Sequence, residues 1–205
     1  MARIDDYLSA RQIAVETLSK ENFNVIAKRT GIEVSEGRAF RIPFLDRVYR
    51  VGFPDFQFVD ESDESKDVPI QEQILILHFM AAGTVSGLSG NWIAYREIPG
   101  AAFYFSAFTK RAVDPLKKVF GHNLSGFSKA AERLYGTPLE AGDSAFEFKI
   151  FPNVPLRLIL WGGDDEFPPE ASIIFDQSIG KIFPPEDIAW LSGMLVYRLI
   201  ALSKM

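Results

Sequence analysis

Two kinds of hydrophobic spacing divide the chain into segments that favour helices and segments that favour strands. In the helical segments, apolar residues recur every three or four positions, which places them on one face of an α-helix. Glycine or proline stands at several of the segment ends, where helices commonly stop or begin. The segments with this pattern are residues 4–18, 22–29, 70–81, 105–119, 127–134 and 184–202.

Elsewhere, apolar and polar residues alternate, which is typical of strands with one buried face. Residues 40–44, 48–51 and 56–58 predict short strands, including a hairpin. Residues 146–150, 156–161 and 172–176 predict a three-stranded antiparallel meander. The fold class that follows is α+β: a mainly antiparallel sheet with a C-terminal three-stranded meander, covered by helices and chiefly by the last one.

The connections between these segments add three local expectations. Residues 91–98 predict another short strand, and the Gly/Ser-rich segment 83–90 predicts a flexible connection, because it lacks the spacing of a phosphate-binding loop. Proline removes a backbone donor, so Asp114-Pro115 predicts either a kink or a new helix start with Asp114 as its N-cap.

With 205 residues, the chain is expected to form a single domain, 1–205, that buries a real core. The spacing of apolar residues is also compatible with a small N-terminal subregion of helices and strands over residues 1–59. The run Asp60–Asp67 contains no apolar residue and is rich in acids, so we expect it to form a mobile loop.

Charge and composition narrow the class of protein. The net charge of -5 and the scattered Lys and Arg argue against a nucleic-acid partner, which needs a clustered positive surface. The absence of cysteine excludes disulfides, thiolate zinc sites, a catalytic cysteine and cysteine-held iron-sulfur clusters. No signal peptide or apolar run of spanning length is present, so the expectation is a cytoplasmic protein without a membrane partner.

Carboxylates concentrate where the meander reverses direction between its last two strands. A Gly-Gly turn and a proline pair surround the acids, so a solvated turn is one interpretation. Converging carboxylates also bind hard divalent cations or divide acid and base roles, although this spacing matches no calcium-loop signature. The residues concerned are Asp164, Asp165, Glu166, Glu170 and Asp176.

A second group of candidates lies in the segment 91–98. Arg96, beside Glu97, has a planar guanidinium that can clamp a carboxylate or phosphate, or pair with the acidic turn itself. Trp92, Tyr95 and Trp161 are candidates for the lining of a pocket. For these aromatics, packing in the core is the alternative.

Four blocks of the sequence carry a resemblance to a known family. They are residues 90–100 (GNWIAYREIPG), 151–156 (FPNVPL), 160–168 (LWGGDDEFP) and 174–178 (IFDQS). From about residue 70 onward, the chain resembles a domain-of-unknown-function family of anaerobic bacteria and archaea. Some relatives in that family are joined to iron-sulfur segments of the kind found in corrinoid proteins. The resemblance implies a setting in anaerobic one-carbon or corrinoid metabolism, but the cluster function does not carry over to a chain without cysteine.

Three functions remain open on these grounds. The first is a non-enzymatic binding or accessory protein of anaerobic metabolism, with a pocket between residues 92–99 and the acidic turn. The second is a metal-assisted or acid/base enzyme that uses the acidic turn 164–176 with Arg96 as a substrate clamp. The third is a homo-oligomeric interaction module. No cofactor is evident, contact with a divalent cation or a corrinoid stays open, and the partner is a small molecule or a protein.

Overall fold

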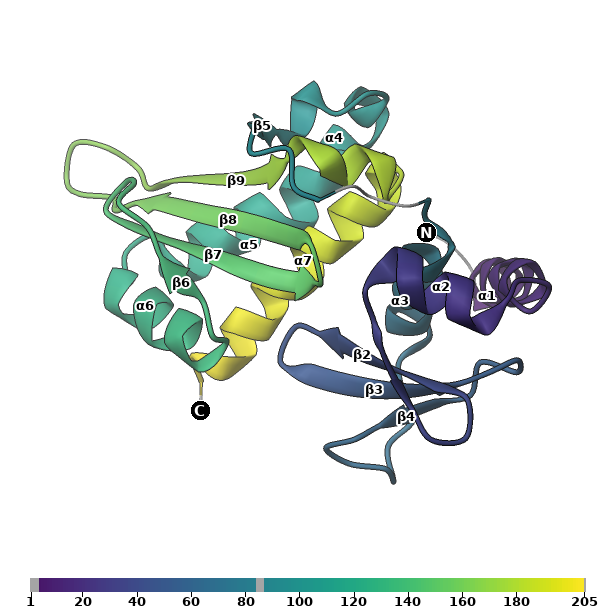
Figure 1. Ribbon diagram of the computed structural model, residues 1–205. Coiled ribbons are helices and arrows are strands. Elements are labelled where there is room, and N and C mark those ends of the chain that lie inside the picture. Colours follow the sequence, from purple (N-terminus) through teal and green to yellow (C-terminus); the bar gives the residue numbers. More distant parts are fainter. Residues whose placement is uncertain (1–3, 84–86, 205) are drawn as a thin grey trace. The chain divides into compact units, whose positions relative to one another are not determined.

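The computed structural model describes residues 4–83 and 87–204 (Figure 1). Residues 84–86, in the segment expected to be a flexible connection, lie outside the described residues. Two antiparallel sheets, of four and five strands, are combined with helices, so the α+β class is confirmed. The chain forms two compact units: Met1–Ser86 with Lys181–Phe183, and Gly87–Gly180 with Pro184–Met205. The subregion expected over residues 1–59 lies within the first unit.

The first unit combines a small sheet with three helices. Its sheet has the antiparallel order β1-β2-β3-β4, and helix α1 packs against α3. The elements are α1 (Ile4–Leu18), α2 (Phe23–Thr30), β1 (Glu33–Ser35), β2 (Ala39–Phe44), β3 (Arg47–Gly52), β4 (Phe58–Asp60) and α3 (Ile70–Ala81).

Local sequence signals explain where helix α2 begins and ends. The Asn22 side chain accepts a hydrogen bond from the Asn24 N–H at 2.9 Å, which satisfies one of the free donors at the helix start. Gly31 adopts the left-handed conformation with φ 68° and donates its N–H to Ala27 O. Gly31 is therefore the C-terminal cap of α2.

The core of the first unit is rich in phenylalanine. Phe23, Phe40, Phe53 and Phe56 form a cluster in which neighbouring ring centroids lie 4.5–6.5 Å apart. Helix α3 is buried on most of its circumference, as its nearly continuous apolar sequence predicts. Edge-on and tilted ring contacts of this kind add to the burial of aromatic area, so this cluster fixes α2 against the sheet.

The second unit contains the longer sheet and the last helix. Its sheet has the antiparallel order β5-β9-β8-β7-β6. The strands are β5 (Trp92–Ala94), β6 (Thr137–Pro138), β7 (Ser144–Phe151), β8 (Val154–Trp161) and β9 (Glu170–Asp176). The helices are η1 (Tyr95–Glu97), η2 (Ala101–Tyr104), α4 (Phe105–Phe108), η3 (Thr109–Val113), α5 (Asp114–Phe120), α6 (Leu124–Arg133), η4 (Gln177–Lys181) and α7 (Pro185–Leu202).

The two faces of this longer sheet differ in character. Helices α5, α6 and α7 all lie on one side of it in Figure 1. The residues that point to this side alternate along the strands and are buried: Phe146, Phe148, Leu156, Leu158, Leu160, Ile173 and Phe175. The intervening residues, which include Glu147, Lys149, Arg157 and Trp161, are half-buried or exposed. We call the face that carries them the outer face of the sheet. The predicted three-stranded meander with one strongly buried face is confirmed.

Helix α4 continues into α5 without a break, although a kink or a restart was expected at Asp114-Pro115. Residues Thr109–Val113 widen into a π-helix, in which the Asp114 N–H donates to Thr109 O five residues earlier. Pro115 has no N–H for Arg111 O, its usual partner four residues before, and the proline ring would clash there. The wider turn absorbs the proline within the helix, and Gly193 of α7 packs against the Arg111 backbone.

The strand predicted over residues 91–98 is wrong in its second half. Only Trp92–Ala94 forms a strand, and Tyr95–Glu97 turns into a 3₁₀-helix. The Glu97 carboxylate accepts the Ala94 N–H at 2.7 Å and so caps the start of this 3₁₀-helix. Across the described residues, none of the helices is both long and apolar enough to span a membrane.

Candidate functional site

The acidic turn between β8 and β9 is held at its start by two hydrogen bonds to neighbouring segments. The Gly162 N–H donates to Asp143 Oδ2 at 2.8 Å, and the Gly163 N–H donates to Gly121 O at 3.0 Å. Within the turn, Asp164 Oδ1 accepts the N–H groups of Glu166 and Phe167 at 2.9 and 2.7 Å. These two hydrogen bonds lower the pKa of Asp164, and the bond from the Phe167 N–H has the larger effect. Asp164 therefore shapes the turn.

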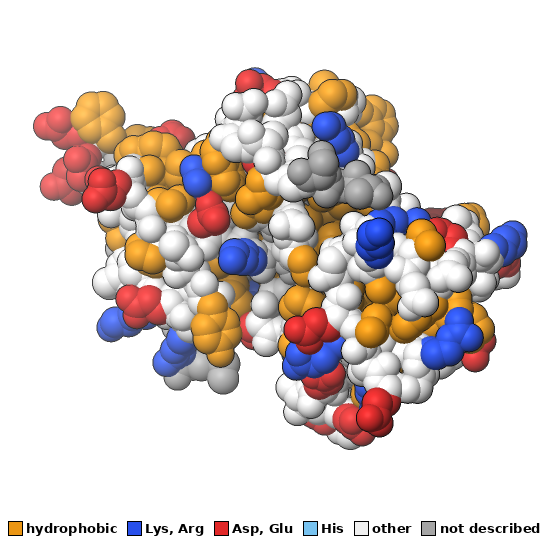
Figure 2. All heavy atoms as spheres, viewed as in Figure 1, with side chains coloured by type: hydrophobic (Ala, Val, Ile, Leu, Met, Phe, Trp, Pro, Cys, Tyr) orange, Lys and Arg blue, Asp and Glu red, His pale blue; other side chains and the backbone are white. Residues whose placement is uncertain are grey.

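The other side chains of the turn face solvent. Asp165 and Glu166 are exposed, and the ring of Phe167 is 68% exposed. In Figure 2, acidic and hydrophobic side chains gather at this tip, at the upper left of the view. The structure thus places these two acids on a protruding, well-anchored hairpin tip.

Asp176 lies at the far end of β9 and has a different role. Its side chain is buried, and it accepts the Ser89, Gly90 and Ser178 N–H groups at 3.0, 2.8 and 2.9 Å. The Ser89 hydroxyl donates to it as well. Burial alone would raise the pKa of Asp176, but these hydrogen bonds outweigh burial and lower it far below its usual range. Asp176 fastens the chain before β5 to the chain after β9.

The structure does not bring Asp176 together with Asp164, Asp165 and Glu166. Strand β9, Glu170–Asp176, separates them, and a strand of this length spans about 20 Å at roughly 3.4 Å per residue. A single cation needs its oxygen ligands within about 2.6 Å. No group of three or more His, Asp or Glu side chains in the described part of the chain is placed to hold a metal ion.

Arg96 and Glu97 are also used locally. The Arg96 guanidinium lies 3.9 Å from the centroid of the Phe105 ring, and Glu97 caps the 3₁₀-helix. Strand β5 pairs with residues 174–176, at the end of β9 opposite the acidic turn. The structure therefore does not place Arg96 beside the acidic turn, where either a pocket or an ion pair was expected.

Tyr95 is a core residue, the alternative that its sequence left open. Its ring stacks on Phe108 with a centroid distance of 4.1 Å and an interplanar angle of 2°. Its hydroxyl donates to Pro185 O at 2.7 Å. Burial, followed by the nearby Tyr104, raises the pKa of Tyr95 to about 12, so the hydroxyl stays protonated at neutral pH.

Trp92 meets a partner that the sequence did not single out. The Arg157 guanidinium of β8 lies 3.5 Å from the centroid of the Trp92 ring, and Arg157 Nε donates to Glu147 Oε2 of β7 at 2.9 Å. The three side chains form a row across the outer face of the sheet. The Arg157 side chain is 28% exposed and that of Glu147 is 23% exposed.

Among the residues that the structure describes, Nε of Arg157 is hydrogen-bonded, whereas neither Nη1 nor Nη2 has a hydrogen-bond partner. Stacking on Trp92 and the bond at Nε nevertheless fix the plane of the group. Ile159 and Trp161 follow Arg157 at alternate positions of β8, and Trp161 is 42% exposed. We call Trp92, Glu147, Arg157 and Trp161 the arginine site.

This combination defines an α+β protein of two units, in which the longer antiparallel sheet has helices on one side and an ordered arginine on the other. The chain belongs to the family described as "Domain of unknown function (DUF3786)", whose model matches residues 22–198. The match confirms membership of a domain-of-unknown-function family. No curated protein and no solved structure matches the chain.

Proposed function

We propose that the protein is a non-enzymatic binding protein whose arginine site binds the carboxylate or phosphate group of a ligand. The observation that carries the proposal is the fixed plane of Arg157, whose Nη1 and Nη2 have no hydrogen-bond partner among the described residues. Two parallel N–H groups match the two oxygens of a carboxylate or phosphate.

Preorganisation supports this function. A free arginine loses about 2 kcal/mol of side-chain entropy when it is held in one geometry. At Arg157, contacts within the protein have already imposed much of that cost, so a ligand meets an ordered fork. Trp161 and Ile159 offer apolar surface on the same face for the rest of the ligand. The acidic turn and Asp176 lie at opposite ends of β9, so their carboxylates do not share one site. For this reason we propose binding and not acid/base chemistry.

The metabolic context of the protein is part of the same proposal. The sequence resemblance implies an accessory role in anaerobic one-carbon or corrinoid metabolism, and a corrinoid with a nucleotide loop carries a phosphate. Such a ligand offers both an anionic group for Arg157 and an extended apolar surface for Trp161.

A ligand that binds only the native state raises its apparent stability, so thermal unfolding tests the proposal. The probes are inorganic phosphate, propionate, cyanocobalamin and cobinamide, the last without the phosphate-bearing loop. We expect at least one probe with a phosphate or carboxylate to raise the Tm of the native protein. Isothermal titration of that probe then gives its affinity.

Two variants separate the contribution of the paired N–H donors of Arg157 from the contribution of its positive charge. Arg157→Lys keeps the charge but loses the paired donors, and Arg157→Ala loses both, so we expect affinity to fall by about tenfold or more in each. Arg96→Lys is the matched control, because Arg96 also stacks on an aromatic ring in the same unit. Equal binding by the native protein and Arg157→Ala would contradict the proposal.

A further inference from the structure

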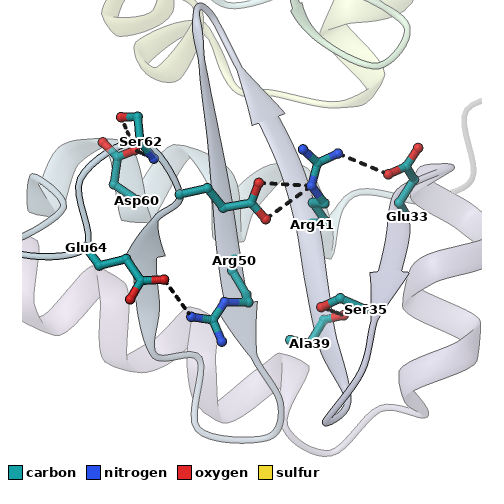
Figure 3. Close-up of polar contacts among 9 residues, drawn as sticks. Glu33, Ser35, Ala39, Arg41, Arg50, Asp60, Ser62 and Glu64 are labelled. Atoms are coloured by element: carbon teal, nitrogen blue, oxygen red, sulfur yellow. Dashed lines mark hydrogen bonds and ion pairs between the residues drawn. The ribbon is translucent and has the colours of Figure 1, made fainter.

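The four-stranded sheet of the first unit carries two arginines directly opposite each other on neighbouring strands. Arg41 of β2 and Arg50 of β3 are paired across the strands (Figure 3). Like charges directly opposite each other in a sheet are destabilising. Their side chains are 44% and 46% exposed, so both guanidinium groups are accessible from solvent. Anionic groups near the two guanidinium groups offset this repulsion.

The anions come from the loop that follows β4. Glu61 accepts the Arg41 Nε–H through both carboxylate oxygens, at 3.1 and 3.0 Å. Glu64 Oε1 accepts from Arg50 Nη2 at 3.3 Å. Two glutamates three positions apart therefore each reach one arginine, and Glu33 Oε2 adds a contact to Arg41 Nη1 at 3.2 Å. Figure 3 shows the carboxylates of Glu64 and Glu33 turned toward Arg50 and Arg41.

The loop has an internal structure that presents these glutamates. Asp60 accepts the Ser62 N–H and hydroxyl, and Asp63 accepts the same two groups of Ser65. This loop was predicted to be mobile, and its mobility stays a prediction. The start of the loop is held to β3, because Arg47 Nη1 donates to the buried Asp60 Oδ2 at 2.7 Å and the Glu61 N–H donates to Val48 O at 3.0 Å. The contacts of the two glutamate side chains to Arg41 and Arg50 are exposed ion pairs, which typically contribute little and weaken further with salt. Carboxylates from another molecule can therefore compete for the same arginines.

We propose that Arg41 and Arg50 form a docking site for an acidic segment of a partner protein, and that Glu61 and Glu64 occupy this site in the free protein. The loop defines the chemistry of the occupant, which is a pair of carboxylates about three residues apart in an extended or turn conformation. The net charge of -5 opposes a long polyanion such as nucleic acid, whereas a short acidic segment needs only the two local charges. This site lies in the first unit and does not depend on the arginine site.

A peptide competition experiment tests the proposal in the full chain. The probe is a fluorescent synthetic peptide with the sequence of residues 60–67, Asp-Glu-Ser-Asp-Glu-Ser-Lys-Asp, and its binding is followed by fluorescence anisotropy at low salt. In the double variant Glu61→Gln with Glu64→Gln, the internal competitor is weakened. We expect this variant to bind the peptide about two- to thirtyfold more tightly than the native chain, the range for two exposed ion pairs.

The arginines themselves are tested in the background of the double variant. Adding Arg41→Gln and Arg50→Gln should abolish the increase in peptide affinity. A peptide with glutamine at both glutamate positions should bind weakly to every variant. Glu36→Gln removes an exposed acid of the same unit that contacts neither arginine, so it should bind like the native chain.

Three results would overturn the proposal. One is equal peptide affinity in the native chain and the glutamine double variant. Another is undiminished binding after both arginines are replaced, with the fold verified by circular dichroism. The third is tighter binding of a single-stranded oligonucleotide than of the peptide, which would replace the acidic protein segment as the occupant.

Discussion

At the scale of single residues, Asp176 joins two segments of the second unit that are far apart in the sequence. Four hydrogen bonds converge on its buried carboxylate, and they come from segments on either side of the β5–β9 pair. Because the carboxylate is ionised, each bond is stronger than a neutral one. A residue that looked like a metal ligand in the sequence is thus a structural anchor.

Replacing Asp176 by asparagine should destabilise the protein by about 2 to 4 kcal/mol, because the amide group turns one acceptor into a donor that faces backbone N–H groups. Urea unfolding followed by circular dichroism measures the change. Asp165→Asn is the matched control, and it should cost less than about 0.5 kcal/mol since Asp165 is exposed.

The difference between native and Asp176→Asn stability should depend on pH in one direction. The folded protein lowers the pKa of Asp176 below the unfolded value of about 3.9. The stabilisation is therefore complete above that value and is lost as the pH falls toward the folded pKa. A difference that grew as the pH was lowered from 5 to 3 would contradict this assignment.

Arg157 illustrates why the candidate site could be predicted only in part. The sequence identified Trp92 and Trp161, because aromatic residues near turns stand out. Arg157 sits at a polar position of an alternating strand, where a solvent-facing charge is the ordinary expectation. Its contact with Trp92 crosses β9, so it depends on a strand order that periodicity does not determine.

At the scale of elements, the spacing of apolar residues predicted the helices and the meander well. It failed at two places where a side chain changes the backbone bonding. Glu97 caps a 3₁₀-helix that begins after Ala94, and Pro115 forces the preceding helical turn to widen. The spacing of apolar residues indicates which face of an element is buried, and it carries no information about these backbone bonds.

The β8–β9 hairpin tip gives a prediction at this scale. A Cβ added at Gly163 would lie 2.5 Å from His122 Cε1 and 2.6 Å from Pro169 Cδ, both too close. Gly163→Ala should therefore displace the tip and destabilise the protein by about 1 to 3 kcal/mol, as overpacking does. Thermal unfolding measures the loss. Gly83→Ala is the control, because a Cβ at Gly83 meets nothing within 4 Å, and an equal loss there would contradict the argument.

At the scale of the whole molecule, each unit has its own sheet and its own buried residues. Local perturbations are expected to stay within such cooperative units. Asp176→Asn should accordingly speed hydrogen exchange of backbone amides in β5 and β9 and leave the amides of β2 and β3 unchanged. Exchange followed by mass spectrometry tests this, and matched acceleration in both sheets would show that the units open together.

The α+β class followed from the sequence because alternating and helical segments are distinct along the chain. The division into units did not, since α3 resembles any buried helix and nothing in its sequence indicates that it packs with α1. Which elements share a core depends on long-range pairing, and a single sequence carries little information about it.

The lengths of the strands at the sheet borders bear on how the protein behaves at high concentration. The border strands β1, β4 and β5 have three residues each, and β6 has two, one of which is Pro138. Unpaired backbone groups along a border strand are a template for aggregation, and short borders or proline blunt it. Strand β8 is paired on both sides, whereas β5 covers only Ile174–Asp176 of β9 and β6 covers only Phe146 and Glu147 of β7. Growth of fibrils by strand addition is therefore limited to the short stretches of β7 and β9 that the border strands leave uncovered.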